Sequence, residues 1–121
     1  MTELPSALDT GTLDELRDSM GGDDEFFAEL VDEFLADGPV QLESLRTALS
    51  SGDADSARRA AHTLKGTGRT FGAETLASLC QEVETAAAAG DMDAGLARID
   101  GIDHEWARVQ SELVPLRETP A

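Results

Sequence analysis

Residues 23–52 read DDEFFAELVDEFLADGPVQLESLRTALSSG, and their apolar residues have helical spacing. The apolar positions form two successive stripes: Phe27, Leu30, Val31, Phe34 and Leu35, then Leu42, Leu45 and Leu49. Acidic residues at the start suit the positive end of a helix dipole. Gly38-Pro39 lies between the stripes, where proline should kink or interrupt a helix. The stretch therefore predicts a long amphipathic helix with a disturbance near its middle.

Two similar junctions divide the chain that follows. They read SGDAD at 51–55 and AGDMD at 89–93. In each, glycine can close one helix as a left-handed cap while aspartate opens the next. Apolar residues keep helical spacing after each junction: Leu76, Leu79, Cys80, Val83 and Ala87, then Leu96, Ile99, Trp106, Val109 and Leu113. We therefore predict four long helices, near residues 24–50, 53–71, 74–89 and 92–114.

Each of these helices has one apolar face, and short connections favour antiparallel neighbours. The predicted fold is all-α, an up-and-down antiparallel four-helix bundle with a short extra N-terminal helix that Thr12 caps and Gly21-Gly22 ends. The length of 121 residues fits a single domain. We expect residues 1–11 to be a flexible lead-in, residues 12–115 to form the bundle, and residues 116–121 to be a frayed tail.

Charge and composition exclude several classes of partner. A formal net charge of -16 disfavours nucleic acid and anionic membranes. No stretch approaches the ~18 to 20 apolar residues that cross a bilayer. The single cysteine, Cys80, lies on an apolar stripe and is expected in the core, and the N-terminus lacks a signal-peptide pattern. These features predict a cytoplasmic protein, and we expect a monomer.

Residues 62–73 read HTLKGTGRTFGA and place two glycines inside a predicted helix. Each glycine costs roughly 1 kcal/mol relative to alanine there, which suggests another purpose. At about 100° per residue, the core face lies opposite His62. Four residues fall within roughly 60° of His62 on the wheel: Arg58, Lys65, Gly66 and Arg69. His62 should therefore face solvent within a basic segment, because the chain has no acidic residue between Asp55 and Glu74.

The position of Gly66 relative to His62 suggests why a glycine stands there. Helical side chains lean toward the N-terminus, so a larger residue four positions after His62 would cover the imidazole. Gly68 instead faces the core edge and suits close packing. An exposed imidazole has an unperturbed pKa of ~6.5 and is mostly a neutral nucleophile near pH 7. The neighbouring cations should oppose its protonation, and they would attract and stabilise a phosphoryl group.

The segment AHTLKGTGRTFGA, residues 61–73, resembles the signature of histidine-containing phosphotransfer (HPt) domains. The resemblance implies that the bundle accepts a phosphoryl group on His62 from the aspartyl phosphate of one receiver domain and passes it to another. It also implies that Lys65 supports the phosphoryl group and that Gly66 permits docking. Arg69 departs from the pattern, which has a small residue there, so it could clamp the phosphate or exclude some receivers. Arg58 and Arg69 are the remaining candidates for partner docking.

The predicted protein is thus a phosphocarrier and not an enzyme with its own kinase or ATP site. Its partners would be receiver domains of response regulators or hybrid histidine kinases, and the receiver would bring the Mg²⁺, with no cofactor or metal on this chain. Two alternatives stay open: an acidic helical adaptor that binds a protein without phosphorylation, and, more weakly, a dimerisation fragment of a histidine kinase. His104 lacks comparable neighbours and is expected to be an ordinary surface residue.

Overall fold

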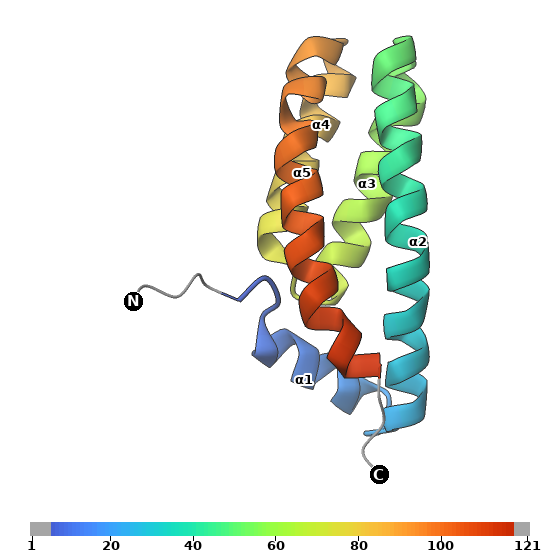
Figure 1. Ribbon diagram of the computed structural model, residues 1–121, viewed down its shortest axis with the longest axis vertical. Helices are drawn as coiled ribbons and strands as arrows, with labels where there is room; N and C mark the ends of the chain where they lie inside the picture. Colours follow the sequence, from blue (N-terminus) through green and yellow to red (C-terminus); the bar gives the residue numbers. More distant parts are fainter. Residues whose placement is uncertain (1–5, 118–121) are drawn as a thin grey trace.

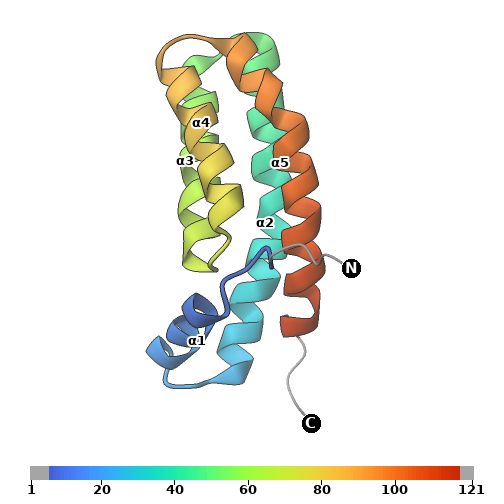
Figure 2. The same cartoon turned by 90° about the vertical axis from the view of Figure 1, so that its left-hand side faces the viewer.

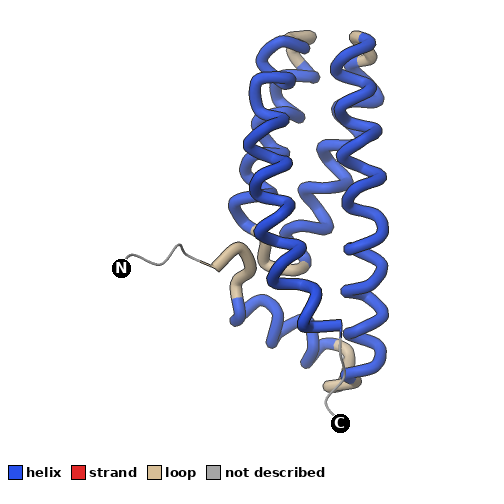
Figure 3. Tube along the Cα trace, in the orientation of Figure 1, coloured by secondary structure: helices blue, strands red, loops and turns tan. Residues whose placement is uncertain are grey.

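The computed structural model describes residues 6–117, which form helices joined by short connections and contain no strand (Figures 1 and 3). The elements are α1 (Thr10–Ser19), α2 (Asp24–Ser51), α3 (Ala54–Thr70), α4 (Glu74–Ala88), α5 (Met92–Leu113) and the 3₁₀ turn η1 (Val114–Arg117). The four predicted long helices are all present, with ends within a few residues of the expected ones. The prediction of an all-α fold is confirmed.

Helices α2 to α5 run alternately up and down, and each packs against the next. α5 returns to pack against α2, which closes the ring and leaves α3 diagonally across from α5. α1 lies below the α3–α4 end, beside the lower part of α2 (Figure 2). The antiparallel four-helix bundle with an extra N-terminal helix is therefore confirmed. Within the described residues, no helix is both long and apolar enough to span a bilayer.

The helix ends follow the two sequence junctions. Asp53 and Asp91 are the N-caps of α3 and α5, and their carboxylates accept hydrogen bonds from the backbone N–H groups of Ser56 and Ala94. Gly52 ends α2 with a φ of 77°, a left-handed conformation that side chains other than glycine rarely adopt. At both junctions, residues of the junction itself thus cap the helix ends, as the sequence indicates.

The sequence predicts a kink or an interruption at Gly38-Pro39, and the interruption is wrong, because helix α2 is continuous through Pro39. Proline removes one backbone donor and costs about 3 kcal/mol in a helix interior. The cost is outweighed because both apolar stripes of α2 pack into the same core. Gly38 also has a role that depends on α5: a Cβ at this position would overlap the Trp106 ring. The Gly38-Pro39 pair therefore permits a close helix contact and does not end the helix.

Aromatic rings fill the core below the middle of the bundle. Phe34 of α2 stacks on Phe71 at the end of α3, with 4.9 Å between ring centroids. Trp106 meets the same Phe34 edge-on at 5.2 Å. Cys80 is fully buried among apolar residues, as expected for a core cysteine. These contacts fix the level of α3 relative to α2 and thereby the position of His62.

The N-terminal segment differs from its prediction. Ala7 and Leu8 are buried, and their backbone N–H groups donate to the Glu112 carboxylate of α5 at 2.6 and 3.1 Å. Asp9, and not Thr12, is the N-cap of α1 because its carboxylate accepts from the backbone N–H of Thr12. This part of the predicted flexible lead-in is therefore packed on the bundle. Residues 1–5 of the lead-in and residues 118–121 of the predicted tail lie outside the described residues.

Candidate functional site

His62 lies on the outer face of α3, and 67% of its side chain is exposed. One turn later, Gly66 leaves open space, because a Cβ built there would meet nothing within 4 Å. The wheel-based placement of His62 and Gly66 on the solvent side agrees with the structure. Gly68 is buried beside Ala73 and Leu76, at ordinary contact distances for an added Cβ.

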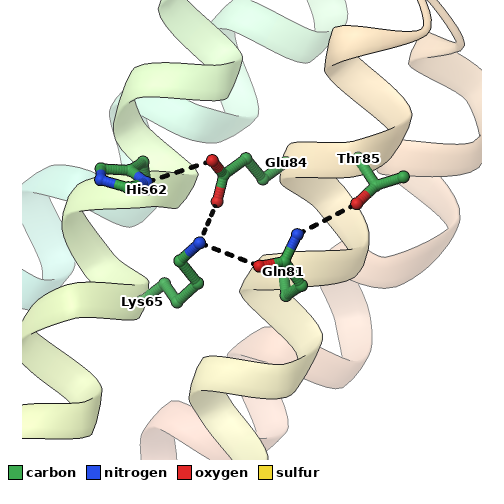
Figure 4. A network of polar contacts seen from close by, with 5 residues as sticks. All are labelled: His62, Lys65, Gln81, Glu84 and Thr85. Atoms are coloured by element: carbon green, nitrogen blue, oxygen red, sulfur yellow. Dashed lines mark hydrogen bonds and ion pairs between the residues drawn. The ribbon is translucent and has the colours of Figure 1, made fainter.

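A carboxylate from the neighbouring helix holds one edge of the His62 ring. Glu84 of α4 places Oε2 3.1 Å from His62 Nδ1, and its Oε1 lies 2.6 Å from Lys65 Nζ (Figure 4). The hydrogen bond from Lys65 is the main cause that holds the pKa of Glu84 below its usual range, and the bond to His62 adds to it. Glu84 is therefore charged near pH 7.

A charged carboxylate can only accept hydrogen bonds, so His62 Nδ1 carries the hydrogen in this contact. In the neutral ring, the lone pair then resides on Nε2. Figure 4 shows this second nitrogen on the side of the ring away from Glu84. A neutral ring in this contact thus has its unprotonated nitrogen on the side away from Glu84.

Lys65 is buried between α3 and α4, with only 8% of the residue exposed. Its ammonium donates to Glu84 and, at 2.9 Å, to Oε1 of Gln81, whose Nε2 donates to Thr85 Oγ1 at 3.1 Å (Figure 4). The helical wheel correctly places Lys65 beside His62, on the flank of α3 that packs against α4. The wheel of α3 alone does not show that Lys65 is buried, because it is α4 that covers that flank.

The arginines of α3 remain exposed, but two of them have partners nearby. Arg58 Nη2 lies 3.8 Å from Asp55 Oδ1, and Arg59 Nε donates to the Asp55 carbonyl at 3.4 Å. Arg69 forms no ion pair within residues 6–117. Counting charge along the chain alone suggested that cations dominate the surroundings of His62. The fold corrects this, since the charge in direct contact with the ring belongs to Glu84.

Glu84 and Gln81 were missed as site residues, although the sequence carries a signal for them. His62 and Glu84 stand at equal distances along the chain from Ala73, in the α3–α4 turn, and the same holds for Lys65 and Gln81. In an antiparallel hairpin, such residues lie at the same level. A polar residue opposite each of His62 and Lys65 could therefore have been read from the turn position.

Other candidates lie away from this site. Cys80 is buried, and burial raises the pKa of its thiol to about 12, so it is unreactive. His104 is exposed on α5, as expected for an ordinary surface residue. Within the described part of the chain, no three His, Cys, Asp or Glu residues are grouped to hold a metal ion. The groups that the structure does bring together are an exposed imidazole, a carboxylate and a buried ammonium.

The chain is similar to known proteins in sequence and in fold. The sequence model of the Hpt domain matches residues 29–112. Histidine-containing phosphotransfer protein B (HptB) from Pseudomonas aeruginosa PAO1 has a similar crystal structure, with a TM-score of 0.84, 33% identity, and coverage of 92% of this chain and 94% of that chain. The HPT domain of a Shewanella sensor hybrid histidine kinase shares the fold, with a TM-score of 0.69, 23% identity, and coverage of 88% and 90%. No curated protein sequence matches the chain.

Proposed function

The chain belongs to the Hpt domain family and serves as a phosphotransfer intermediate of phosphorelays, and we propose that His62 is its phosphoacceptor. The observation that carries this proposal is the exposed His62 ring, whose Nδ1 is held by Glu84 while Nε2 is free to react. The donor would be the aspartyl phosphate of one receiver domain, and the acceptor would be the aspartate of another.

In the proposed transfer, the Nε2 lone pair attacks the phosphorus atom of the aspartyl phosphate. An N–P bond forms, the P–O bond to the aspartate breaks, and the aspartate leaves as a carboxylate. No proton needs to move, because Nδ1 keeps its hydrogen toward Glu84. The ring gains positive charge as the bond forms, and the adjacent Glu84 carboxylate stabilises that charge, in the way carboxylates orient and stabilise catalytic imidazoles elsewhere. Passage to the second receiver is the reverse reaction.

Lys65 is suited to support the phosphoryl group. An ammonium has three donors, and Lys65 uses two of them for Glu84 and Gln81. The third has no acceptor within residues 6–117, and we propose that an oxygen of the phosphoryl group on His62 would be that acceptor. Its burial fixes the ammonium in place, so the group pays little conformational entropy when the phosphoryl group arrives.

We assign the remaining chemistry to the partner. The receiver would supply the aspartate and the Mg²⁺, and this chain would act as a carrier without kinase activity of its own. Gly66 would give the receiver access to His62, while the exposed Arg58 and Arg69 would contact it. The cytoplasmic location and the monomeric state stay predictions.

The direct test uses receiver domains carrying a radiolabelled phosphoryl group. Wild-type protein should take up acid-labile label, the His62→Gln variant should take up none, and the matched control His104→Gln should behave as wild type. Label on the His62→Gln variant would refute the assignment. Absence of label on wild type, against all receivers of the source organism, would favour the adaptor alternative.

A further inference from the structure

A groove runs beside His62 on the side away from Glu84. Its walls are α2 and α3, which lie side by side (Figures 1 and 2). The lining residues from α2 are Leu30, Glu33, Phe34 and Asp37. The α3 wall includes His62 and the uncovered Gly66, and Phe71 lies at its end. A protein partner that covers this side of His62 therefore also covers the two carboxylates of α2.

The two carboxylates of this groove differ from several of their neighbours on α2. Glu33 and Asp37 are exposed, lie one turn apart, and form no ion pair or hydrogen bond within residues 6–117. Three other acidic residues of the helix are paired with arginines: Asp24 with Arg17, Asp32 with Arg117, and Glu43 with Arg46. The carboxylates that line the groove together with His62 are thus available to a partner.

The α3 side of the same face carries the opposite sign. Arg58 lies one turn before His62 and Arg69 two turns after it, and both are exposed. The face around the phosphoacceptor is therefore divided, with cations along α3 and carboxylates along α2. Such a divided surface favours one orientation of a partner with the complementary pattern.

This pattern constrains the receiver. An aspartyl phosphate is anionic and suits the cationic α3 side. The part of the receiver that lies over Glu33 and Asp37 would meet repulsion if it were acidic, and like charges in contact cost several kcal/mol at an interface. A receiver with a lysine or arginine there would instead gain an ion pair with the α2 carboxylates.

We propose that Glu33 and Asp37 are specificity-determining residues, which select receiver domains that carry a basic side chain on the surface that lies over the α2 wall of the groove. The proposal rests on the proposed function, since it concerns the partner of the His62 site. The partner is thus a receiver whose anionic aspartyl phosphate meets His62 and whose basic side chain lies over Glu33 and Asp37.

The test reverses both charges in the double variant Glu33→Lys/Asp37→Lys. The matched control, Asp93→Lys/Asp100→Lys, makes the same change at exposed positions on α5, which packs on α2 and α4. Each protein is tested in two separate assays. In one, the phosphoryl donor is phosphoramidate, a small molecule that needs no docking. In the other, the donors are phosphorylated receiver domains of the source organism. The groove variant should label normally with phosphoramidate, yet receive label at least about 10-fold more slowly from the receiver that serves wild type best.

The control should keep the wild-type transfer rate from that receiver, and the loss in the groove variant should shrink at high salt. Changing the receiver's basic residue to glutamate should restore transfer to the groove variant. If the receiver transfers to wild type and to the groove variant at equal rates, or if the control loses as much as the groove variant, the specificity role of Glu33 and Asp37 is wrong. The phosphoacceptor role of His62 would not be affected by either result. If phosphoramidate fails to label wild type at His62, the proposed function itself fails.

Discussion

At the scale of single residues, the contact between His62 and Glu84 sets the chemistry of the site. A hydrogen bond to a charged group contributes about 1.5–3 kcal/mol, and about 1.4 kcal/mol corresponds to a tenfold change in rate. We therefore expect Glu84→Ala to slow labelling by phosphoramidate about tenfold or more. Glu84→Gln should lose less, because its amide oxygen still accepts from Nδ1.

Nitrogen-15 NMR of the imidazole checks the cause of that loss. Wild-type His62 should show one dominant tautomer with hydrogen on Nδ1, whereas Glu84→Ala should show a mixture. Wild-type labelling rates together with an unchanged tautomer in Glu84→Ala would show that Glu84 does not position the ring.

Gly66 allows docking to be separated from chemistry. A tryptophan at this position has room to fold, because nothing lies within 4 Å of its Cβ, but its ring would stand over the approach to His62. We expect Gly66→Trp to slow transfer from a receiver by about 100-fold, since small misplacements of reacting groups cost that much. Labelling by phosphoramidate should change little.

Gly101→Trp is the control for Gly66→Trp, because Gly101 is equally open but lies on α5. It should transfer as wild type does. If both variants exchange phosphoryl groups with receivers at the wild-type rate, then the open space at Gly66 is not the docking path.

At the scale of helices, the close contact between α2 and α5 depends on Gly38. A Cβ there would overlap Trp106, and overpacking a core costs about 1–3 kcal/mol. Gly38→Ala should therefore lower the free energy of unfolding, even though alanine favours a helix by about 1 kcal/mol. Gly101→Ala, which has open space, should instead raise it by up to about 1 kcal/mol.

Urea unfolding measures both variants. The chain has a single tryptophan, so Trp106 fluorescence should shift in Gly38→Ala and stay constant in Gly101→Ala. A Gly38→Ala protein as stable as wild type would mean that the ring can move aside, and that Pro39 is tolerated for another reason.

Helix ends could be predicted from sequence because they depend on local chemistry. Asp53 and Asp91 bond to backbone groups within their own first turns, and Gly52 adopts a left-handed conformation by itself. The continuity of α2 through Pro39 could not be predicted in this way, because it depends on packing against Trp106 of α5, which is far along the chain. The packed N-terminal segment was missed for the same reason, since its partner is Glu112.

The candidate site divides in the same way. The exposure of His62 follows from the periodicity of α3, so a helical wheel of this one helix was enough to predict it. The burial of Lys65 and the contact with Glu84 arise between helices, and a single-helix wheel does not show which flank the next helix covers. The equal spacing of both pairs from the α3–α4 turn carries that information.

At the scale of the whole molecule, charge is the dominant feature. The net charge is -16, and self-repulsion of this size opposes the compact state. The ion pairs within residues 6–117 lie mostly on the surface, where each contributes little. We therefore expect sodium chloride to raise the free energy of unfolding between low and physiological ionic strength.

Urea titrations at pH 7 and several salt concentrations measure this effect. Circular dichroism should report unchanged helix content in the folded baselines. A fall in stability with salt would show that the attractive pairs outweigh the repulsion, and that the charge pattern stabilises the bundle.

We propose that the phosphoryl group is carried on Nε2 of His62. The most direct measurement is NMR of protein labelled with nitrogen-15 at histidine and phosphorylated by a receiver, in which coupling to phosphorus identifies the bonded nitrogen. We expect phosphorus coupled to Nε2 of His62, with Nδ1 still protonated toward Glu84. A phosphoryl group on Nδ1, or on any other residue, would contradict the account.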